Sequence, residues 1–215
     1  MAPVITLIRH AEGFHNLYRD YQTIIDPKLT DLGKHQCLAV RNQFSQHDKV
    51  SHILVSPLFR TIETGYHCFK PAIDRGVKIT AMPQVTANAA DGCNHGHAPQ
   101  EIIAWAKETL GNDVLDEESF RWLVPYWYAK SEGLYEDNEA KLRMRASVAR
   151  QIIQRAASSA GDDAHIVVVS HWEFLPYLVG DDRGQSGPQW NNAEWRSYTI
   201  AARADGEPTL VQIGE

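Results

Sequence analysis

The stretch VITLIRHAEGFHN, residues 4–16, decides the fold and points to the chemistry. Five strand-like residues end in the pair Arg9–His10, and a polar turn that contains glycine follows. A buried strand that ends in a cation beside an imidazole presents both groups to the cleft at the edge of a sheet. We therefore predict a first strand over residues 4–8 with a functional site at its end.

A second apolar run near the other end of the chain repeats this design. It reads HIVVVSHWEFL, residues 165–175, and its strand-like part ends in Ser170–His171. In open α/β sheets the ligand crevice lies outside the carboxyl ends of the strands. Two strands that each deliver a histidine there predict one site built from both ends of the chain.

Composition limits the class of protein. The 215 residues are 43% hydrophobic, which is enough for one substantial core, so we predict a single domain over residues 1–215. The net charge of -6 argues against nucleic acid or an anionic membrane as a partner. No apolar run approaches the roughly 20 residues of a transmembrane span, and the start lacks the basic region of a signal peptide. Three scattered cysteines without a CxxC pattern favour a reduced, cytoplasmic setting.

Periodicity predicts strands that alternate with helices along the chain. The predicted elements are strands at 4–8, 53–55, 77–82 and 166–169, helices at 31–46, 56–69, 139–156 and 172–179, and a hairpin of 196–202 with 209–213. Thr30 is the predicted cap of the first helix, and Ser56–Pro57 the predicted cap and first residue of the second. This order predicts an α/β fold: a three-layer sandwich with a mainly parallel central sheet flanked by helices.

Four basic side chains are predicted to lie just past strand ends, namely Arg9, His10, Arg60 and His171, with Asn16 in the first turn. Two arginines form a bidentate receptor for a tetrahedral oxyanion. One neutral imidazole can attack phosphorus, and the second can donate to the oxygens as negative charge develops. Because the arginines would neutralise the phosphate, this chemistry requires no metal and no other cofactor.

Other interpretations of these histidines remain open. Arg9–His10 alone could be a salt-bridging pair at a strand end, and His171 a capping or core residue, although its place beside Ser170 favours a site. His95 and His97 near Cys93 could be metal ligands, but a surface loop is the more common use of such a pair. The aromatic run 122–128, WLVPYWY, is interpreted as helix packing rather than as a substrate-binding surface.

Five segments, taken in order, resemble the histidine phosphatase superfamily in its phosphoglycerate-mutase-like branch, in a fungal-type sequence. They are LIRHAEGFHN (7–16), DPKLTDLGKHQ (26–36), LVSPLFRTIETG (54–65), VVSHWEFL (168–175) and WNNAEWRSY (190–198). The resemblance covers nearly the whole length. It implies the family's α/β sandwich with a small helical cap, here about residues 86–135.

The resemblance also implies roles for individual residues. His10 would be the nucleophile that becomes phosphorylated, with His171 as the second catalytic histidine. Arg9 and Arg60 would complete the phosphate pocket together with His171. Asn16 and Thr23 would be further phosphate contacts.

Two departures from the family bear on the reaction. Where relatives carry a glutamate that protonates the leaving oxygen, this chain has Ala87, and the candidates to replace it are Asp91, His95 and Glu173. General acid catalysis is worth roughly 10²–10⁴-fold for a poor leaving group, so its loss favours diphosphates, acyl or enol phosphates, or phosphoramidates. The residue after the second histidine is Trp172 instead of a small one, which places an indole at the substrate pocket.

The sequence thus predicts a metal-independent phosphatase of a small-molecule phosphate or diphosphate, acting through phospho-His10. Two alternatives stay open. The first is a biosynthetic enzyme that uses the oxyanion pocket for acid/base chemistry without phosphoryl transfer. The second is a phosphate-binding descendant without catalysis. The sequence does not decide the oligomeric state, and a homodimer is one of the states it allows.

Overall fold

The computed structural model describes residues 2–18, 20, 23–181 and 183–214. Its centre is a six-stranded sheet in the order β3-β2-β4-β1-β5-β6. The strands are β1 (Val4–Arg9), β2 (Val50–Val55), β3 (Ile79–Ala81), β4 (His165–Ser170), β5 (Trp195–Ala202) and β6 (Pro208–Gln212). The first four run parallel, while the β5–β6 hairpin is antiparallel to β1. The predicted mainly parallel sheet and the predicted C-terminal hairpin are both confirmed.

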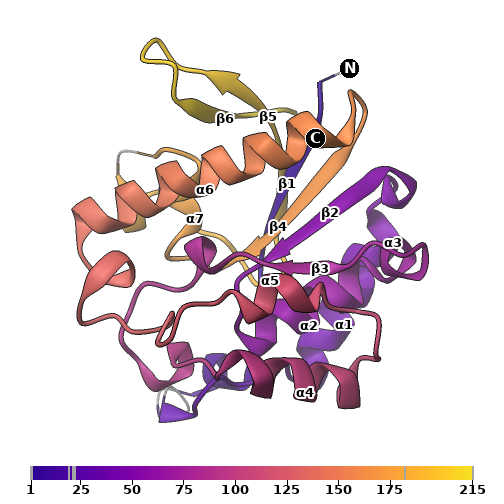
Figure 1. Cartoon of the computed structure of the whole chain (residues 1–215), viewed down its shortest axis with the longest axis vertical. Coiled ribbons are helices and arrows are strands. Elements are labelled where there is room, and N and C mark those ends of the chain that lie inside the picture. Colours follow the sequence, from indigo (N-terminus) through magenta and orange to yellow (C-terminus); the bar gives the residue numbers. More distant parts are fainter. Residues whose placement is uncertain (1, 19, 21–22, 182, 215) are drawn as a thin grey trace.

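Helices cover both faces of this sheet. They are α1 (Asp31–Gln43), α2 (Phe59–Cys68), α3 (Lys70–Asp74), α4 (Pro99–Thr109), α5 (Glu117–Arg121), α6 (Glu139–Ala160) and α7 (Leu175–Leu178). Short 3-10 turns are η1 (Phe14–Asn16), η3 (His47–Lys49), η4 (Pro83–Val85), η5 (Gly92–Asn94), η6 (Gly133–Tyr135) and η7 (Gly184–Ser186). Figure 1 shows α6 along one side of the sheet and α1, α2 and α4 together on the other. The predicted three-layer α/β sandwich is confirmed.

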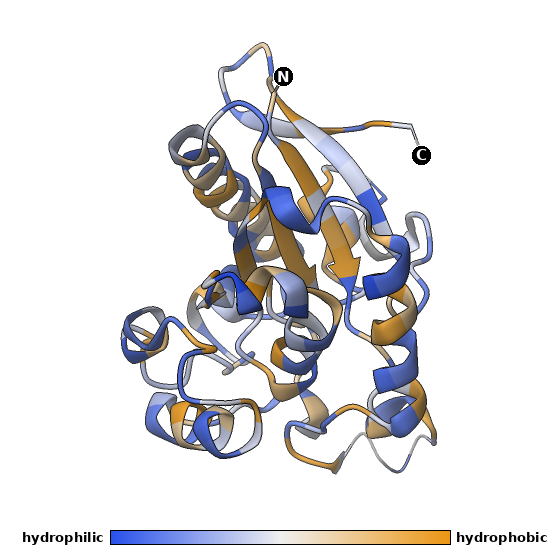
Figure 2. Cartoon of the chain, turned by 90° about the vertical axis from the view of Figure 1, so that its right-hand side faces the viewer, coloured by the Kyte–Doolittle hydropathy of each residue, from blue (hydrophilic) through white to orange (hydrophobic). Residues whose placement is uncertain are grey.

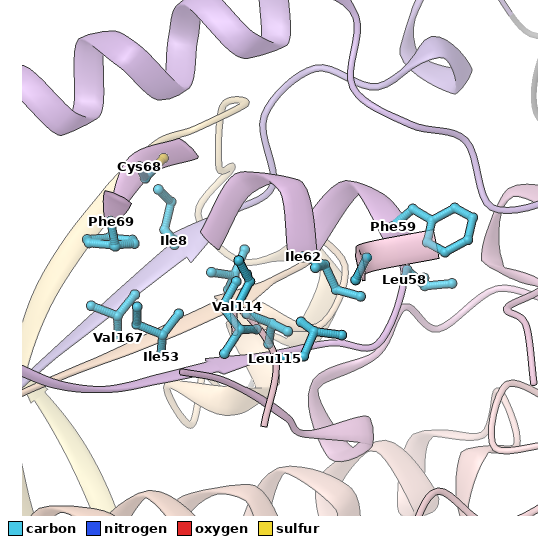
Figure 3. Close-up of a cluster of buried hydrophobic side chains, with 14 of the residues drawn as sticks. Ile8, Ile53, Leu58, Phe59, Ile62, Cys68, Phe69, Val114, Leu115 and Val167 are labelled. Atoms are coloured by element: carbon cyan, nitrogen blue, oxygen red, sulfur yellow. The ribbon is translucent and has the colours of Figure 1, made fainter. Parts of the chain in front are cut away.

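The strands are apolar on both sides because both sides are covered. On β4, Val167 and Val169 belong to the core under α1, α2 and α4, whereas Ile166 and Val168 belong to the core under α6 and α7. Figure 2 shows the central strands as the most hydrophobic ribbons, and Figure 3 shows Val167 among side chains of the first core. A buried parallel sheet holds its strand ends firmly, which suits a site that needs fixed geometry.

The start of α1 is tied to the turn that follows β1. Thr30 caps the helix as predicted, its Oγ1 accepting a hydrogen bond from the Gly33 N–H at 2.9 Å. The Glu12 carbonyl passes so close that a Cβ on Gly33 would lie 2.1 Å from its oxygen. Only glycine fits at this position, so the sequence around Gly33 fixes the turn beside His10.

The predicted start of α2 is wrong. The helix begins at Phe59 with Leu58 as its N-cap residue, and no side chain caps it. The Ser56 hydroxyl lies instead 3.0 Å from Nε2 of His171, so it belongs to the site and is not free to cap a helix. Arg60 does lie in the first turn, as predicted.

Several other predicted boundaries also differ. The first helix ends at residue 43 instead of 46 because Phe44 is extended. The third strand covers only residues 79–81 of the predicted 77–82. Residues 172–174 form a turn, and α7 begins only at Leu175, where Pro176 fits the first helical turn. The strong helix predicted over 139–156 is present and extends to residue 160.

The segment predicted as a cap, residues 86–135, contains α4, α5 and two short turns between β3 and α6. Its early part includes η5, which carries Cys93 and Asn94 toward α2. Within the described residues, no helix is both long and apolar enough to cross a membrane.

Candidate active site

The carboxyl ends of β1 and β4 lie side by side, since Arg9 pairs with Ser170 in the parallel register. His10 and His171 are the next residues on each strand, and their ring centroids are 5.1 Å apart. Arg60, from the first turn of α2, contacts His171 directly. The structure thus brings together the two ends of the chain in the way that the paired strand ends predict.

His10 is held in one tautomer. Its Nδ1 lies 2.7 Å from the carbonyl oxygen of Ala11, and because a carbonyl only accepts, Nδ1 carries the hydrogen. The lone pair is therefore on Nε2. The side chain is only 2% exposed, and burial, followed by the charge of Arg60, lowers the pKa of His10 well below its usual value. At neutral pH, His10 is a neutral imidazole with a free basic nitrogen.

His171 is held in the same kind of way. Arg60 Nη2 lies 3.2 Å from its Nδ1, and a guanidinium only donates, so Nδ1 accepts and the ring hydrogen is on Nε2. That hydrogen points to the Ser56 hydroxyl at 3.0 Å. Burial, with Arg60 next, lowers the pKa of His171 well below its usual value. Ser56 is thus a positioning residue.

Arg60 is almost completely buried and is aimed by the η5 loop. Its Nη1 donates to the carbonyl of Cys93 at 2.6 Å, and its Nη2 donates to Oδ1 of Asn94 at 2.7 Å. The Nε atom has no partner among the described residues. Sequence reasoning missed Asn94, and the only signal was its place between Cys93 and His95.

Arg9 is aimed by the C-terminal segment that precedes β5. Its Nη1 donates to the carbonyl of Trp190 at 2.6 Å, while its Nε is buried and meets no hydrogen-bond acceptor in the part of the chain that the structure describes. Burial, followed by the charge of Arg60, lowers the pKa of Arg9 to about 10, so the side chain remains a cation at neutral pH. Two guanidinium groups with unused donors are what a bound oxyanion needs.

Asn16 lies at the rim of this site. Its Oδ1 accepts from the Gly13 N–H at 3.0 Å and faces Nδ2 of Asn192 at 3.3 Å. The same Asn192 Nδ2 donates to the His10 carbonyl at 3.1 Å. Thr23 is different, because its side chain is exposed and donates to the carbonyl of Asp20 within its own loop. No contact of the described residues joins Thr23 to the other predicted site residues.

A third imidazole, which sequence reasoning missed, lies against the nucleophile. The ring centroid of His15 is 5.3 Å from that of His10, and its Nδ1 is buried with no partner among the described residues. Burial, then the charges of Arg60 and Arg9, lower the pKa of His15 to about 2. The available signal was its place in the opening stretch, where it immediately precedes Asn16.

Ala87 is fully buried, and the loop around it is clamped from two sides. Arg145 of α6 donates to Oδ1 of Asn88 at 2.7 Å. Oε2 of Glu173 accepts from the backbone N–H groups of Asn88 and Ala89, both at 3.2 Å. Glu173 thereby ties this loop to the turn that follows β4.

The remaining predicted residues lie further out. Asp91 and His95 are exposed, and the His95 ring packs against that of Tyr128 at 4.4 Å. Trp172 is half-buried and packs against the core on the α6 side. Of the three candidates for the missing proton donor, Glu173 alone influences the pocket, where its charge raises the pKa of Arg9.

No group of three or more His, Cys, Asp or Glu side chains within the described residues could hold a metal ion. The three cysteines are buried and free of disulfide bonds.

A sequence profile of the histidine phosphatase superfamily (branch 1) matches residues 5–215. The chain belongs to this superfamily. Among its relatives, it is 27% identical to phosphoglycerate mutase-like protein 1 of Arabidopsis thaliana, over 93% of this chain and 82% of the relative. It is also 26% identical to sedoheptulose 1,7-bisphosphatase of Saccharomyces cerevisiae, over 83% of this chain and 67% of that protein.

Solved structures show the same histidine phosphatase fold. The ecdysone phosphate phosphatase of Bombix mori, in complex with tungstate, matches with a TM-score of 0.69 at 15% identity, over 99% of this chain and 92% of that one. The mycobacterial glucosyl-3-phosphoglycerate phosphatase matches with a TM-score of 0.60 at 16% identity, over 99% and 97% of the two chains. At these identities the likeness concerns the fold.

Proposed function

We propose that this member of the superfamily is a metal-independent phosphatase of small-molecule phosphates or diphosphates, acting through phosphohistidine on His10. The observation that supports it most is the state of His10, which is neutral, with its lone pair on Nε2, beside the guanidinium groups of Arg9 and Arg60. A non-catalytic phosphate binder would need the arginines but not a nucleophile held in this tautomer.

The first step is binding and attack. The phosphate oxygens accept hydrogen bonds from Arg9 and Arg60, whose buried Nε atoms lack partners among the described residues. His10 Nε2 attacks phosphorus, the bond to the leaving oxygen breaks, and its electron pair leaves with that oxygen. The Ala11 carbonyl, already bonded to Nδ1, stabilises the positive charge that develops on the ring.

The second step is hydrolysis. A water oxygen attacks phosphorus, the P–N bond to His10 breaks, and inorganic phosphate is released with the imidazole restored. Arg60 lies close to His10 and can stabilise the equatorial oxygens in both steps through its Nε. His171, whose ring hydrogen points to Ser56, accepts from Arg60 and holds it in place. Ser56 keeps His171 in the required orientation by its hydrogen bond to Nε2.

The leaving group limits the class of substrate. With buried Ala87 at the family's acid position, the carboxylic acid that would protonate a leaving alkoxide is absent there. The protein therefore either acts on diphosphates or acyl phosphates, whose leaving groups need no proton, or takes the proton from another side chain.

A panel of phosphate monoesters, diphosphates and acyl phosphates tests the proposal. We expect release of inorganic phosphate from at least one class, and His10→Ala should abolish it. His35→Ala is the matched control, because His35 lies on the exposed side of α1, and it should keep full activity. Full activity of His10→Ala would contradict the mechanism, and tight phosphate binding without turnover by the unaltered protein would favour the non-catalytic alternative.

A further inference from the structure

We propose that His15 is the proton donor to the leaving oxygen, in place of the carboxylic acid absent at Ala87, so that ordinary alkyl phosphate monoesters are substrates. This inference rests on the proposed phosphatase function and adds a catalytic residue to it. It also widens the expected substrate class. With a proton donor present, an alkoxide leaving group can depart as a neutral alcohol, so the substrate need not be a diphosphate or an acyl phosphate.

The His15 ring lies directly against the proposed nucleophile. Its ring lies 5.3 Å from the ring of His10, with an interplanar angle of 45°. The ring packs over the backbone of Gly13, where an added Cβ would lie 2.9 Å from Nδ1 and Cε1 of His15. The η1 turn that carries His15 is fixed in turn by the bond from the Gly13 N–H to Asn16.

The Nδ1 atom of His15 is buried and has no partner in the described part of the chain. Leaving a buried polar atom unsatisfied costs about 1–3 kcal/mol, so such atoms in a site mark a place where a ligand atom completes the hydrogen bonding. A leaving oxygen held against the two arginines is an atom of the right kind.

The charges around His15 make its protonation depend on substrate binding. The charged and titratable groups around it are Arg9 at the end of β1, Arg60 on α2, His10 after β1 and His171 after β4. Burial, followed by the charges of Arg60 and Arg9, lowers the pKa of His15 to about 2. A bound phosphate dianion neutralises both arginines and adds negative charge beside the ring, which raises the pKa of His15. Binding and proton uptake are therefore coupled.

The proton balance closes over the cycle. In the first step the bond from His10 Nε2 to phosphorus forms, the P–O bond to the substrate breaks, and the imidazolium of His15 gives its proton to that oxygen, releasing an alcohol. In the second step the neutral His15 takes a proton from the attacking water while the P–N bond breaks. Phosphate leaves, and His15 has recovered its proton.

Other groups fit the role less well. Asp91 and His95 are exposed, and Oε2 of Glu173 is already occupied by the backbone N–H groups of Asn88 and Ala89. Asp26 is the strongest competitor, because burial raises its pKa to about 8 and it is protonated at neutral pH. Its Oδ1 accepts from the Phe59 N–H at the start of α2, and no described contact joins it to His10.

The dependence of rate on the leaving group tests the proposal. For His15→Gln we expect kcat/KM for an alkyl phosphate to fall by about 10²–10⁴-fold, while kcat/KM for p-nitrophenyl phosphate falls by less than about tenfold, because nitrophenolate leaves without a proton. His35→Gln, on the exposed side of α1, should change neither rate. Gly13 has a φ of -105°, which alanine also adopts, so Gly13→Ala changes only the space beside the His15 ring. The added methyl should displace the ring and lower kcat/KM for the alkyl phosphate selectively, by a smaller factor than His15→Gln.

Proton uptake gives an independent readout. Tungstate stays dianionic at neutral pH, so calorimetry in buffers of different ionisation enthalpy should show a proton taken up when it binds at pH 7, and none with His15→Gln. An equal loss with both substrates in His15→Gln, or a selective loss in Asp26→Asn instead, would overturn the role of His15. If the unaltered protein releases phosphate from neither substrate and from no diphosphate or acyl phosphate, the proposed function itself fails. Turnover of diphosphates or acyl phosphates alone would overturn only the role of His15.

Discussion

At the scale of single residues, the tautomers of the two site histidines are set by partners that can only accept or only donate a hydrogen bond. The Ala11 carbonyl fixes the proton of His10 on Nδ1, and the Arg60 guanidinium fixes that of His171 on Nε2. Sequence could predict both histidines, because each follows an apolar strand. It could not predict His15 or Asn94, since their roles depend on how the turns after the strands fold back.

Asn94→Ala tests how Arg60 is aimed. The change removes one of the two acceptors of Arg60 Nη2 and leaves His171 Nδ1, while the Cys93 carbonyl still holds Nη1. Losing a hydrogen bond to a buried charged donor costs about 1–3 kcal/mol, so we expect phosphate to bind about 5- to 150-fold more weakly. Titration calorimetry with inorganic phosphate measures this, and unchanged affinity would show that the η5 loop does not position Arg60.

At the scale of elements, the strands and long helices follow from sequence, but the segments between them do not. The apolar runs of the sequence predict β1 and β4, and its helical periodicity predicts α6. The predicted start of α2 is wrong by two residues, because Ser56 pairs with His171, which is 115 residues away in sequence. Long-range partners of this kind override local capping preferences, and they are most frequent where a site is built.

Gly33→Ala tests the link between α1 and the turn after β1. An added methyl would meet the Glu12 carbonyl oxygen at 2.1 Å, and that backbone is fixed between Thr30 and the end of β1. We expect the free energy of unfolding, measured by urea denaturation, to fall by about 3 kcal/mol or more. Gly214→Ala makes the same chemical change where no atom lies within 4 Å, and should leave stability unchanged. Equal stability of both variants would contradict this close approach.

At the scale of the whole molecule, arginines and neutral imidazoles are buried in the interior of the protein. The pKa values of His10 and His171 are lowered well below 6.5, that of His15 to about 2, and that of His165, the first residue of β4, to about 4, in each case chiefly by burial. Such groups bind protons more readily in the unfolded chain than in the folded one, so the site makes stability dependent on pH.

We therefore predict that the protein loses stability as the pH falls from about 6.5 toward 4. In this range the unfolded histidines are protonated and the folded ones are not, and each contributes about 1.4 kcal/mol per pH unit. Asp26, whose pKa is raised to about 8, acts in the opposite sense between its unfolded value of 3.8 and 8, and offsets about one histidine. Urea unfolding measured at several pH values checks the slope, and a flat profile from pH 7 to 4.5 would show that the imidazoles are not buried as neutral groups.

The most direct measurement of the central claim is to trap the phosphoenzyme by rapid quenching during turnover and to locate the phosphoryl group by mass spectrometry. Because Nδ1 of His10 is bonded to the Ala11 carbonyl, the account predicts one acid-labile phosphoryl group on Nε2 of His10, and none in His10→Ala. Turnover without a phosphoenzyme, or a phosphoryl group on any other residue, would contradict it.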